Sequence, residues 1–228
     1  MIVWVASHQR SGNTLTLQTL HDVFGINRFC TIHDPDLWLK GGDRSDSYDV
    51  PEELEALDHD AKLEAIRERP EPFFVKSHRV EDSEDPSPAL YIVRDGRDVH
   101  VSRAHFLNDR KVGDFELTFE QRLRELVTHR TWSEHVETWR ARPAPTAVIR
   151  FEDLVGDPGA VIAMRCEQIG VELPERAGEL TDFQVLRERN PIQHRQGKVG
   201  GWSDEMPLEI EERFWGVHWE QMEALGYE

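Results

Sequence analysis

The first 24 residues constrain the fold more than any other segment, because they predict a strand, a tight loop and a helix in immediate succession. The apolar run at residues 2–6 suits a strand that is buried on both faces of a parallel sheet. The helix that follows carries an apolar stripe formed by Leu17, Leu20 and Phe24. Between strand and helix lies a small polar loop that holds one basic residue, Arg10-Ser11-Gly12-Asn13-Thr14.

This loop predicts an anion-binding site. Free backbone N–H groups and the positive end of the helix dipole meet at the start of a helix, and both favour a bound anion. Nucleotide phosphates are the usual anions at such a place. The Walker A pattern Gly-x4-Gly-Lys-Ser/Thr is absent from the loop, so the sequence points to a donor other than ATP.

Composition limits the class of protein. The 228 residues are enough for one sizeable α/β domain, so we expect a single domain over residues 1–228. The formal net charge of −17 repels polyanions and argues against nucleic-acid binding, so a phosphate site must be a local basic pocket. Cys30 and Cys166 are expected to be reduced thiols. We find no leader segment and no apolar stretch long enough for a membrane span, and we expect a cytoplasmic protein.

Four apolar runs predict strands at residues 2–6, 72–76, 89–94 and 146–150, with helical patterns between them. This alternation is typical of a parallel sheet with crossover helices. We therefore expect an α/β fold with three α/β/α layers, a central mostly parallel sheet and a P-loop-like phosphate-binding loop.

Further helices are predicted from their start signals. Pro51 opens one, with apolar residues following to position 65. Thr118 and Gln121 predict a capping box before a long helix to about residue 140. The pair Asp157-Pro158 opens a helix to residue 168, and Pro207 precedes the last helix. Three irregular stretches, 25–50, 79–88 and 190–206, are expected to be lids or binding segments.

Residues that could carry chemistry follow two of the predicted strands. Lys76 and His78 come at the carboxyl end of the second apolar run, which in open α/β sheets faces the ligand crevice. Imidazole titrates near neutral pH, so His78 is a candidate general base, although most single histidines are surface or capping residues. Arg94 ends the next strand and Ser102 follows on a helix, and together they could bind a phosphate. Arg97 is expected to form an internal ion pair with Asp95 or Asp98, and Arg94 is not.

A glycine-rich basic segment, Arg195-Gln196-Gly197-Lys198-Val199-Gly200-Gly201-Trp202, suits a loop that folds over an anion. Taken in order, the motifs of the chain resemble the family of sulfotransferases that use 3′-phosphoadenosine 5′-phosphosulfate as donor. The resemblance extends from residue 3 to about residue 202. It rests on the loop at 10–14, Lys76-Ser77-His78, Arg94-Asp95-Gly96-Arg97-Asp98 with Ser102, Phe151-Glu152-Asp153-Leu154 and Arg195-x-Gly197-x-x-Gly200.

The resemblance implies a role for each matching residue. The loop that holds the 5′-phosphosulfate corresponds to Arg10, Ser11, Gly12, Asn13, Thr14 and Leu15. Arg10, where many relatives have lysine, would steady the bridging oxygen during transfer. His78 would deprotonate the acceptor hydroxyl and Lys76 would lie near the sulfuryl group. Arg94 and Ser102 would bind the 3′-phosphate.

The resemblance also implies an adenine side and a closing loop. Phe151 stands where many relatives have an adenine-side tyrosine, and Thr181 and Phe183 resemble a further adenine-side segment. Arg195, Gln196 and Gly197 match the loop that closes over the 3′-phosphate. Many relatives have lysine in place of Gln196, so this clamp lacks one cation, for which Lys198 is a candidate substitute.

The predicted function is therefore in-line transfer of a sulfuryl group from 3′-phosphoadenosine 5′-phosphosulfate to a hydroxyl or amine, without a metal. The alternatives are a nucleotide or small-molecule kinase of P-loop type and a silent protein that binds adenosine 3′,5′-bisphosphate. The sequence leaves the acceptor open among small molecules, lipids and glycans. Aromatic residues that could line its pocket, or equally fill the core, are Phe29, Trp38, Tyr48, Phe106 and Phe115. The aromatic stripe of the last helix is a candidate homodimer face, although we favour its packing onto the sheet.

Overall fold

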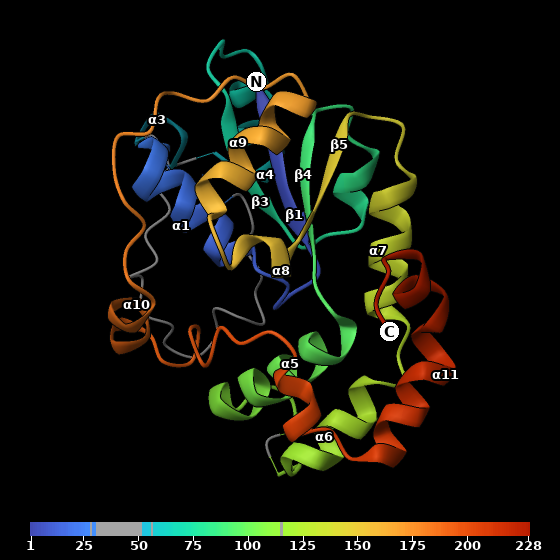
Figure 1. The fold of residues 1–228 in the computed structure, drawn as a ribbon. Helices are drawn as coiled ribbons and strands as arrows, with labels where there is room; N and C mark the ends of the chain where they lie inside the picture. Colours follow the sequence, from blue (N-terminus) through green and yellow to red (C-terminus); the bar gives the residue numbers. More distant parts are fainter. Residues whose placement is uncertain (28, 31–51, 56, 115) are drawn as a thin grey trace.

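The computed structural model describes residues 1–27, 29–30, 52–55, 57–114 and 116–228 (Figure 1). Its centre is a sheet with the strand order β2-β3-β1-β4-β5, in which every neighbouring pair is parallel. The strands are β1 (Ile2–Ser7), β2 (Phe29–Cys30), β3 (Phe73–Ser77), β4 (Ala89–Val93) and β5 (Thr146–Arg150). The predicted α/β fold with a parallel central sheet is confirmed.

Helices cover both faces of the sheet because the side chains of β1 alternate between two apolar cores. Val3 and Val5 pack in one core with residues of α1 (Asn13–Phe24) and α9 (Pro158–Gln168). Ile2, Trp4 and Ala6 pack in the other core. That second core is shared with α4 (His59–Arg67), α5 (Gly96–Arg110), α7 (Thr131–Ala141) and α11 (Leu208–Ala224). Figure 1 shows α1 and α9 on one side of the sheet and α7 and α11 on the other.

All four predicted strands are present, with no end shifted by more than one residue, and β2 was missed. The second strand begins at Phe73, whose N–H donates to the Met1 carbonyl, because Pro72 has no N–H to join the ladder. The strand β2 has two residues, which is too short for any periodic signal, and it lies in a stretch predicted to be irregular. Its side chains, like residues 31–51, lie outside the described part of the chain.

Two predicted helices are each broken in the structure. The helix expected from Pro51 to residue 65 consists of α3 (Glu52–Glu55) and α4, because the Asp58 carboxylate accepts a hydrogen bond from the Ala61 N–H and starts a new helix. Pro51 itself lies outside the described residues.

The predicted helix to residue 140 consists of α6 (Phe119–Leu126) and α7. The Thr118–Gln121 capping box is confirmed. Helix α6 ends at Leu126 and α7 begins at Thr131. Between them, Thr128 Oγ1 donates to the Glu125 carbonyl at 2.7 Å, a side-chain hydrogen bond that competes with helical hydrogen bonding.

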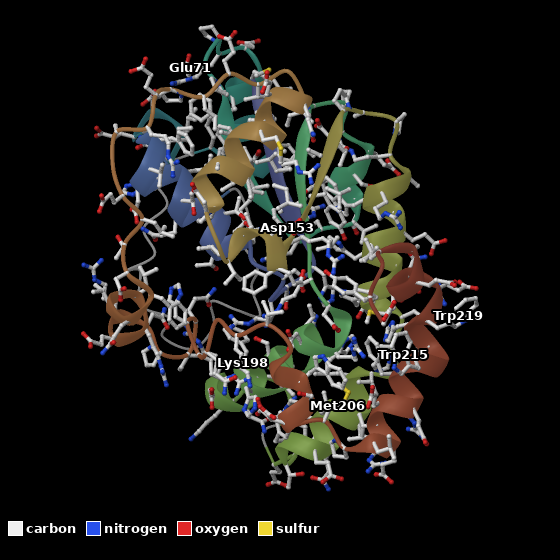
Figure 2. The ribbon with its side chains drawn as sticks, in the orientation of Figure 1. Glu71, Asp153, Lys198, Met206, Trp215 and Trp219 are labelled. Carbon is white, nitrogen blue, oxygen red and sulfur yellow. The ribbon has the colours of Figure 1, made fainter. Side chains whose placement is uncertain are left out.

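The remaining elements agree more closely with the sequence. Asp157 accepts from the Ala160 N–H at the start of α9, as predicted, and the buried thiol of Cys166 in this helix is free. On α11 the buried residues are Ile210, Phe214, His218 and Met222. Trp219 is 51% exposed, and Figure 2 shows it on the outer side of α11.

Two 3₁₀ turns occupy stretches predicted to be irregular, one short helix directly follows β5, and another ends just before the stretch at 190–206. They are α8 (Phe151–Leu154), α10 (Phe183–Arg189) and two 3₁₀ turns, η1 (Glu81–Glu84) and η2 (Gly201–Asp204). Within the described ranges, no helix is both long enough and apolar enough to cross a bilayer.

The carboxyl ends of the parallel strands all point to one edge of the sheet, where α1, α5 and α8 begin (Figure 1). In open parallel sheets this edge is where ligands bind. The candidate site residues that follow β1, β3, β4 and β5 therefore meet there.

Candidate functional site

The loop between β1 and α1 has the backbone of an anion cradle. Arg10 and Gly12 have positive φ values of 71° and 115°. A Cβ atom on Gly12 would lie 2.7 Å from Cδ2 of Phe151, so no larger residue fits there without a shift. Gly12 is also the N-cap of α1 and supplies no side-chain cap to the first-turn N–H groups. These N–H groups are therefore suited to donate to a ligand.

Ser11 adds a donor to this cradle. Its side chain is 1% exposed, and Oγ has no hydrogen-bond partner among the described residues. A buried hydroxyl without a partner costs free energy. A ligand oxygen would remove that cost, which makes Ser11 a good match for its predicted role.

The next three residues of the loop attach the cradle to the rest of the fold. The Asn13 side chain donates to the carbonyls of Val5 (2.8 Å) and Ser77 (3.4 Å), which joins β1 to β3. Thr14 Oγ1 accepts from Gln193 Nε2 at 2.7 Å, and Leu15 packs against the core beneath α1. For Asn13 and Leu15, only the backbone is therefore directed toward an anion.

His78 is held by the end of β1. Ala6 pairs with Ser77 across the sheet, which brings the next residues together. Nδ1 of His78 lies 2.7 Å from the Ser7 carbonyl oxygen. Because a carbonyl can only accept, Nδ1 carries the proton and donates it. In the neutral ring Nε2 is then the proton acceptor, which is the tautomer that a general base needs.

The surroundings of His78 favour its neutral form. Burial, strengthened by the positive charge of Lys76, holds the pKa of His78 well below the ordinary value of 6.5. The ring of His135 and the guanidinium of Arg103 act in the same direction. His78 is therefore a neutral imidazole at physiological pH.

Arg94 lies between the loop at residue 10 and the loop at residue 198. Its Nη1 donates to the Arg10 carbonyl (3.3 Å) and its Nη2 to the Lys198 carbonyl (2.8 Å). The guanidinium lies over the Phe151 ring at 4.5 Å. Contrary to our expectation, Arg94 also forms an ion pair with Asp98, at 3.3 Å, because one helical turn brings the two side chains to the same face.

Arg97 follows the prediction of an internal ion pair. Its guanidinium is bound to both carboxylate oxygens of Asp95, at 3.0 and 2.8 Å, and lies over the rings of Trp202 and Trp215. It is buried in this network and points away from the anion cradle.

Arg10 and Ser102, which were predicted to contact opposite ends of the donor, are in direct contact. Arg10 Nε donates to Ser102 Oγ at 3.1 Å, and Arg10 Nη2 donates to the Gln193 carbonyl at 3.0 Å. Phe106, predicted as a pocket or core residue, lies under the Arg10 guanidinium at 4.9 Å. Of the other aromatic pocket candidates, Trp38, Tyr48, Phe115 and the Phe29 side chain lie outside the described residues.

The basic loop at 195–202 is anchored by Asp98. Its two carboxylate oxygens accept from the N–H groups of Gly200 and Trp202, both at 2.9 Å. Arg195 forms a two-point ion pair with Glu205, at 3.3 and 3.0 Å. Lys198, considered as a substitute for the missing cation, is bound to Asp204 at 2.7 Å and labelled in Figure 2. The loop is therefore preformed, while its cations already have carboxylate partners.

The predicted adenine-side residues are not all brought together. Phe151 lies beside Arg94 and Gly12, and a Cβ added to Gly197, where φ is 61°, would lie 2.9 Å from the Phe183 ring. Gln196 is exposed nearby. Thr181 instead donates through its N–H to the Asp22 carboxylate on the last turns of α1, so it lies away from the cradle.

A hollow of about 490 Å³ lies beside Phe183, lined also by Gln184, Arg187, Glu188 and Pro191. In the described part of the chain, no group of three or more His, Cys, Asp or Glu residues is arranged to hold a metal ion.

Sequence reasoning missed several residues of this region. Gln193 has no recognisable signal, yet it binds both Arg10 and Thr14. Asp98 lies inside a quoted motif, but its role as loop anchor depends on a partner about a hundred residues later. Glu205 could have been found only as one of the two acidic residues, Asp204 and Glu205, that follow the basic loop.

Comparisons with known proteins agree with this geometry. A family model described as "Sulfotransferase domain" matches residues 2–226. Sulfotransferase 4A1 of Mus musculus is 24% identical over 243 residues, which cover 96% of this chain and 80% of that protein. Sulfotransferase 1A1 of Mus musculus is 25% identical over 185 residues, or 67% of this chain. The matched region spans 63% and 66% of the lengths of mouse sulfotransferases 1A1 and 1B1.

Solved structures show a similar fold. Mouse sulfotransferase SULT7A1 complexed with PAP aligns with a TM-score of 0.68 at 16% identity, covering 96% of this chain and 84% of that one. Retinol dehydratase in complex with androsterone and inactive cofactor PAP aligns with a TM-score of 0.63 at 20% identity, covering 97% and 80%.

Proposed function

The chain belongs to the sulfotransferase family, and from this premise we propose that it transfers a sulfuryl group from 3′-phosphoadenosine 5′-phosphosulfate to a hydroxyl or an amine of a small molecule. We treat residues 1–228 as one sulfotransferase domain. The observation that carries the proposal is the hydrogen bond from His78 Nδ1 to the Ser7 carbonyl, because it leaves Nε2 as a proton acceptor at the ligand edge of the sheet.

The residues at this edge fit the donor. Gly12 leaves space that a Cβ would fill, and the first-turn N–H groups of α1 receive no side-chain cap. Ser11 Oγ is buried without a partner among the described residues. Arg94, just after β4, and Ser102, on α5, supply a cation and a hydroxyl, which suits a second phosphate. Phe151 offers an aromatic ring beside Gly12 and Arg94.

The proposed chemistry is one in-line displacement at sulfur. The acceptor oxygen or nitrogen forms a bond to sulfur while the bond from sulfur to the bridging phosphate oxygen breaks. The acceptor proton passes to His78 Nε2. The electron pair of the broken bond stays on adenosine 3′,5′-bisphosphate, the leaving group. Lys76 and the N–H groups of the cradle stabilise the negative charge that develops there.

We propose the class of acceptor from the molecules bound in structures of similar fold. Retinol dehydratase was solved with androsterone and with retinol, which are small apolar alcohols. We extend this to a small-molecule acceptor here, with lipid and glycan hydroxyls as alternatives. Cytoplasmic location and a homodimer stay predictions.

Calorimetry tests the proposed function against the kinase alternative. The full chain should bind adenosine 3′,5′-bisphosphate and should bind ATP–magnesium weakly or not at all. Tight binding of ATP–magnesium with no response to the bisphosphate would favour a kinase instead.

Incubation with ³⁵S-labelled donor and a panel of alcohols, phenols and amines should then give a labelled product. Binding of the bisphosphate with no transfer to any acceptor, and no slow hydrolysis of the donor, would favour a silent binding protein.

A further inference from the structure

The guanidinium of Arg10 is directed toward α5 and away from the first turn of α1. Its Nε donates to Ser102 Oγ on α5 at 3.1 Å, and Phe106, also on α5, lies under it at 4.9 Å. Its Nη2 donates to the carbonyl of Gln193 at 3.0 Å. None of these partners belongs to the cradle at residues 11–15.

The backbone of Arg10 reinforces this direction. Its φ of 71° is unusual for a residue with a side chain. Its carbonyl accepts from Arg94 Nη1 at 3.3 Å. Arg94 and Ser102 therefore each form a hydrogen bond with Arg10, and the left-handed turn at Arg10 accompanies a side chain directed toward Ser102.

Arg10 is the arginine of this cluster that has no carboxylate partner among the described residues. Arg94 is paired with Asp98 and Arg195 with Glu205. Among the described residues, none forms an ion pair with Arg10, and none accepts from its Nη1. Burial together with the positive charges of Arg94, Arg195 and Arg110 lowers the pKa of Arg10 to about 10, against a weaker opposing effect of Asp109. A dianion beside Arg10 would remove this penalty.

Ser102 matches the same ligand. Its Oγ accepts from Arg10 Nε, so its own proton remains available to donate to another oxygen. One phosphate could then accept from both side chains at once. On the other side of the site, Lys76 lies close enough to His78 to lower its pKa and is the cation beside the base.

We propose that Arg10 binds the 3′-phosphate of the donor beside Arg94 and Ser102, the pair to which the resemblance already assigns that phosphate. Lys76 keeps the position near the sulfuryl group that the resemblance implies. The inference rests on the proposed function. It departs from the role at the bridging oxygen that the family resemblance implies for position 10. It makes Arg10 a determinant of selectivity for nucleotides with a 3′-phosphate.

The test compares two nucleotides that differ only in that phosphate. Affinities of the full chain for adenosine 3′,5′-bisphosphate and for adenosine 5′-phosphate are measured by calorimetry, with competition titrations for the weaker ligand. The dissociation constant for adenosine 5′-phosphate divided by that for adenosine 3′,5′-bisphosphate measures what the 3′-phosphate contributes to affinity. Arg10→Asn is the main variant because asparagine tolerates a positive φ. Arg10→Ala is the second variant, and Arg130→Ala, at an exposed arginine, is the matched control.

Arg10→Asn should lower the ratio by about tenfold or more, since a hydrogen bond to a charged group is lost. Its affinity for adenosine 5′-phosphate should change by less than about twofold. Ser102→Ala should act in the same direction, and the double variant should show less than the product of the two single effects because both residues contact one phosphate. The Arg130→Ala ratio should equal that of the unmodified chain.

Equal weakening of both nucleotides by Arg10→Asn and Arg10→Ala, with the ratio unchanged, would overturn the inference and return Arg10 to the sulfuryl end. The proposed function itself would fail if the unmodified chain did not bind adenosine 3′,5′-bisphosphate, or bound both nucleotides equally. Circular dichroism and thermal melting of each variant separate loss of binding from loss of fold.

Discussion

Ser7, the last residue of β1, and His78, the first residue after β3, are joined by a 2.7 Å hydrogen bond from the imidazole Nδ1 to the Ser7 carbonyl. Two neighbouring parallel strands thus fix the tautomer and the direction of one ring. The orientation of the candidate base is set by main-chain geometry, which no side-chain substitution at residue 7 removes.

The first prediction concerns His78 as the general base. His78→Asn keeps a donor for the Ser7 carbonyl but has no proton acceptor equivalent to Nε2. We expect kcat to fall by about 10²–10⁴-fold, the usual contribution of general acid–base catalysis. Binding of adenosine 3′,5′-bisphosphate, measured by calorimetry, should stay within about twofold. His129→Asn, at an exposed histidine, is the control, and a His78 variant with normal turnover would remove this residue from the mechanism.

The second prediction concerns the pH dependence of turnover. Burial and Lys76 lower the pKa of His78, so its neutral form persists below pH 6.5. The acid limb of kcat/KM should therefore lie below pH 6.5. Lys76→Gln removes a positive charge, which raises the pKa of His78 and should move the limb to higher pH. Lys76→Arg keeps the charge and should leave the limb in place. If the acid limb of Lys76→Gln lay at the same pH as that of the unmodified chain, Lys76 would not influence the pKa of the base.

The third prediction concerns Gly12. Gly12→Ala combines a φ of 115° with a Cβ only 2.7 Å from the Phe151 ring. We expect a loss of about 1–3 kcal/mol in unfolding free energy and weaker binding of adenosine 3′,5′-bisphosphate. The double variant Gly12→Ala/Phe151→Leu should recover part of the stability, because the steric contact is relieved while the backbone strain remains.

Gly216 provides the matched control for this substitution. It lies on α11 with an ordinary helical φ, and an added Cβ would meet open space. Gly216→Ala should therefore stabilise the protein by about 0.5–1 kcal/mol. If denaturant unfolding showed the same change for both alanine variants, Gly12 would not be the constrained position that the structure describes.

The fourth prediction concerns stability in acid. Burial lowers the pKa of His100 from 6.5 to about 4. Below pH 6.5 the unfolded chain binds a proton that the folded chain does not, so this residue lowers the unfolding free energy as pH falls from 6.5 to about 4. The full effect is about 3 kcal/mol.

Substitution of His100 isolates that contribution. His100→Asn should reduce the loss of unfolding free energy between pH 7 and pH 4.5 by about 2–3 kcal/mol. His129→Asn should leave the loss unchanged. Urea unfolding at a series of pH values gives the dependence of unfolding free energy on pH for each variant. If that dependence were the same for His100→Asn and the unmodified chain, His100 would not be the source of the acid destabilisation.

The sequence was sufficient wherever the signal is local. Short apolar runs predicted four of the five strands, and their shared direction predicted which edge of the sheet carries the ligand site. The Thr118–Gln121 capping box was predicted from residues three positions apart, and the Asp157 cap from the adjacent pair Asp157-Pro158. Such patterns depend on hydrogen bonds within one turn, so the sequence alone specifies them.

The breaks in the two helices and the two-residue strand β2 were missed because none of them changes the apolar periodicity. The breaks coincide with local side-chain hydrogen bonds, from the Ala61 N–H to Asp58 and from Thr128 to the Glu125 carbonyl. The two residues of β2 belong to the sheet only because β3 lies beside them.

The residue types of the candidate site and their order along the chain were determined by the sequence, which therefore indicated the family and predicted a phosphate site at one edge of the sheet. The partners of each charged side chain were decided only by the tertiary structure. Arg10 meets Ser102 across 92 positions and Gln193 across 183, while Arg94 and Arg195 are neutralised by Asp98 and Glu205. The physical reason is that a side chain selects a partner by distance in space, and separation along the chain does not fix that distance until the fold has formed.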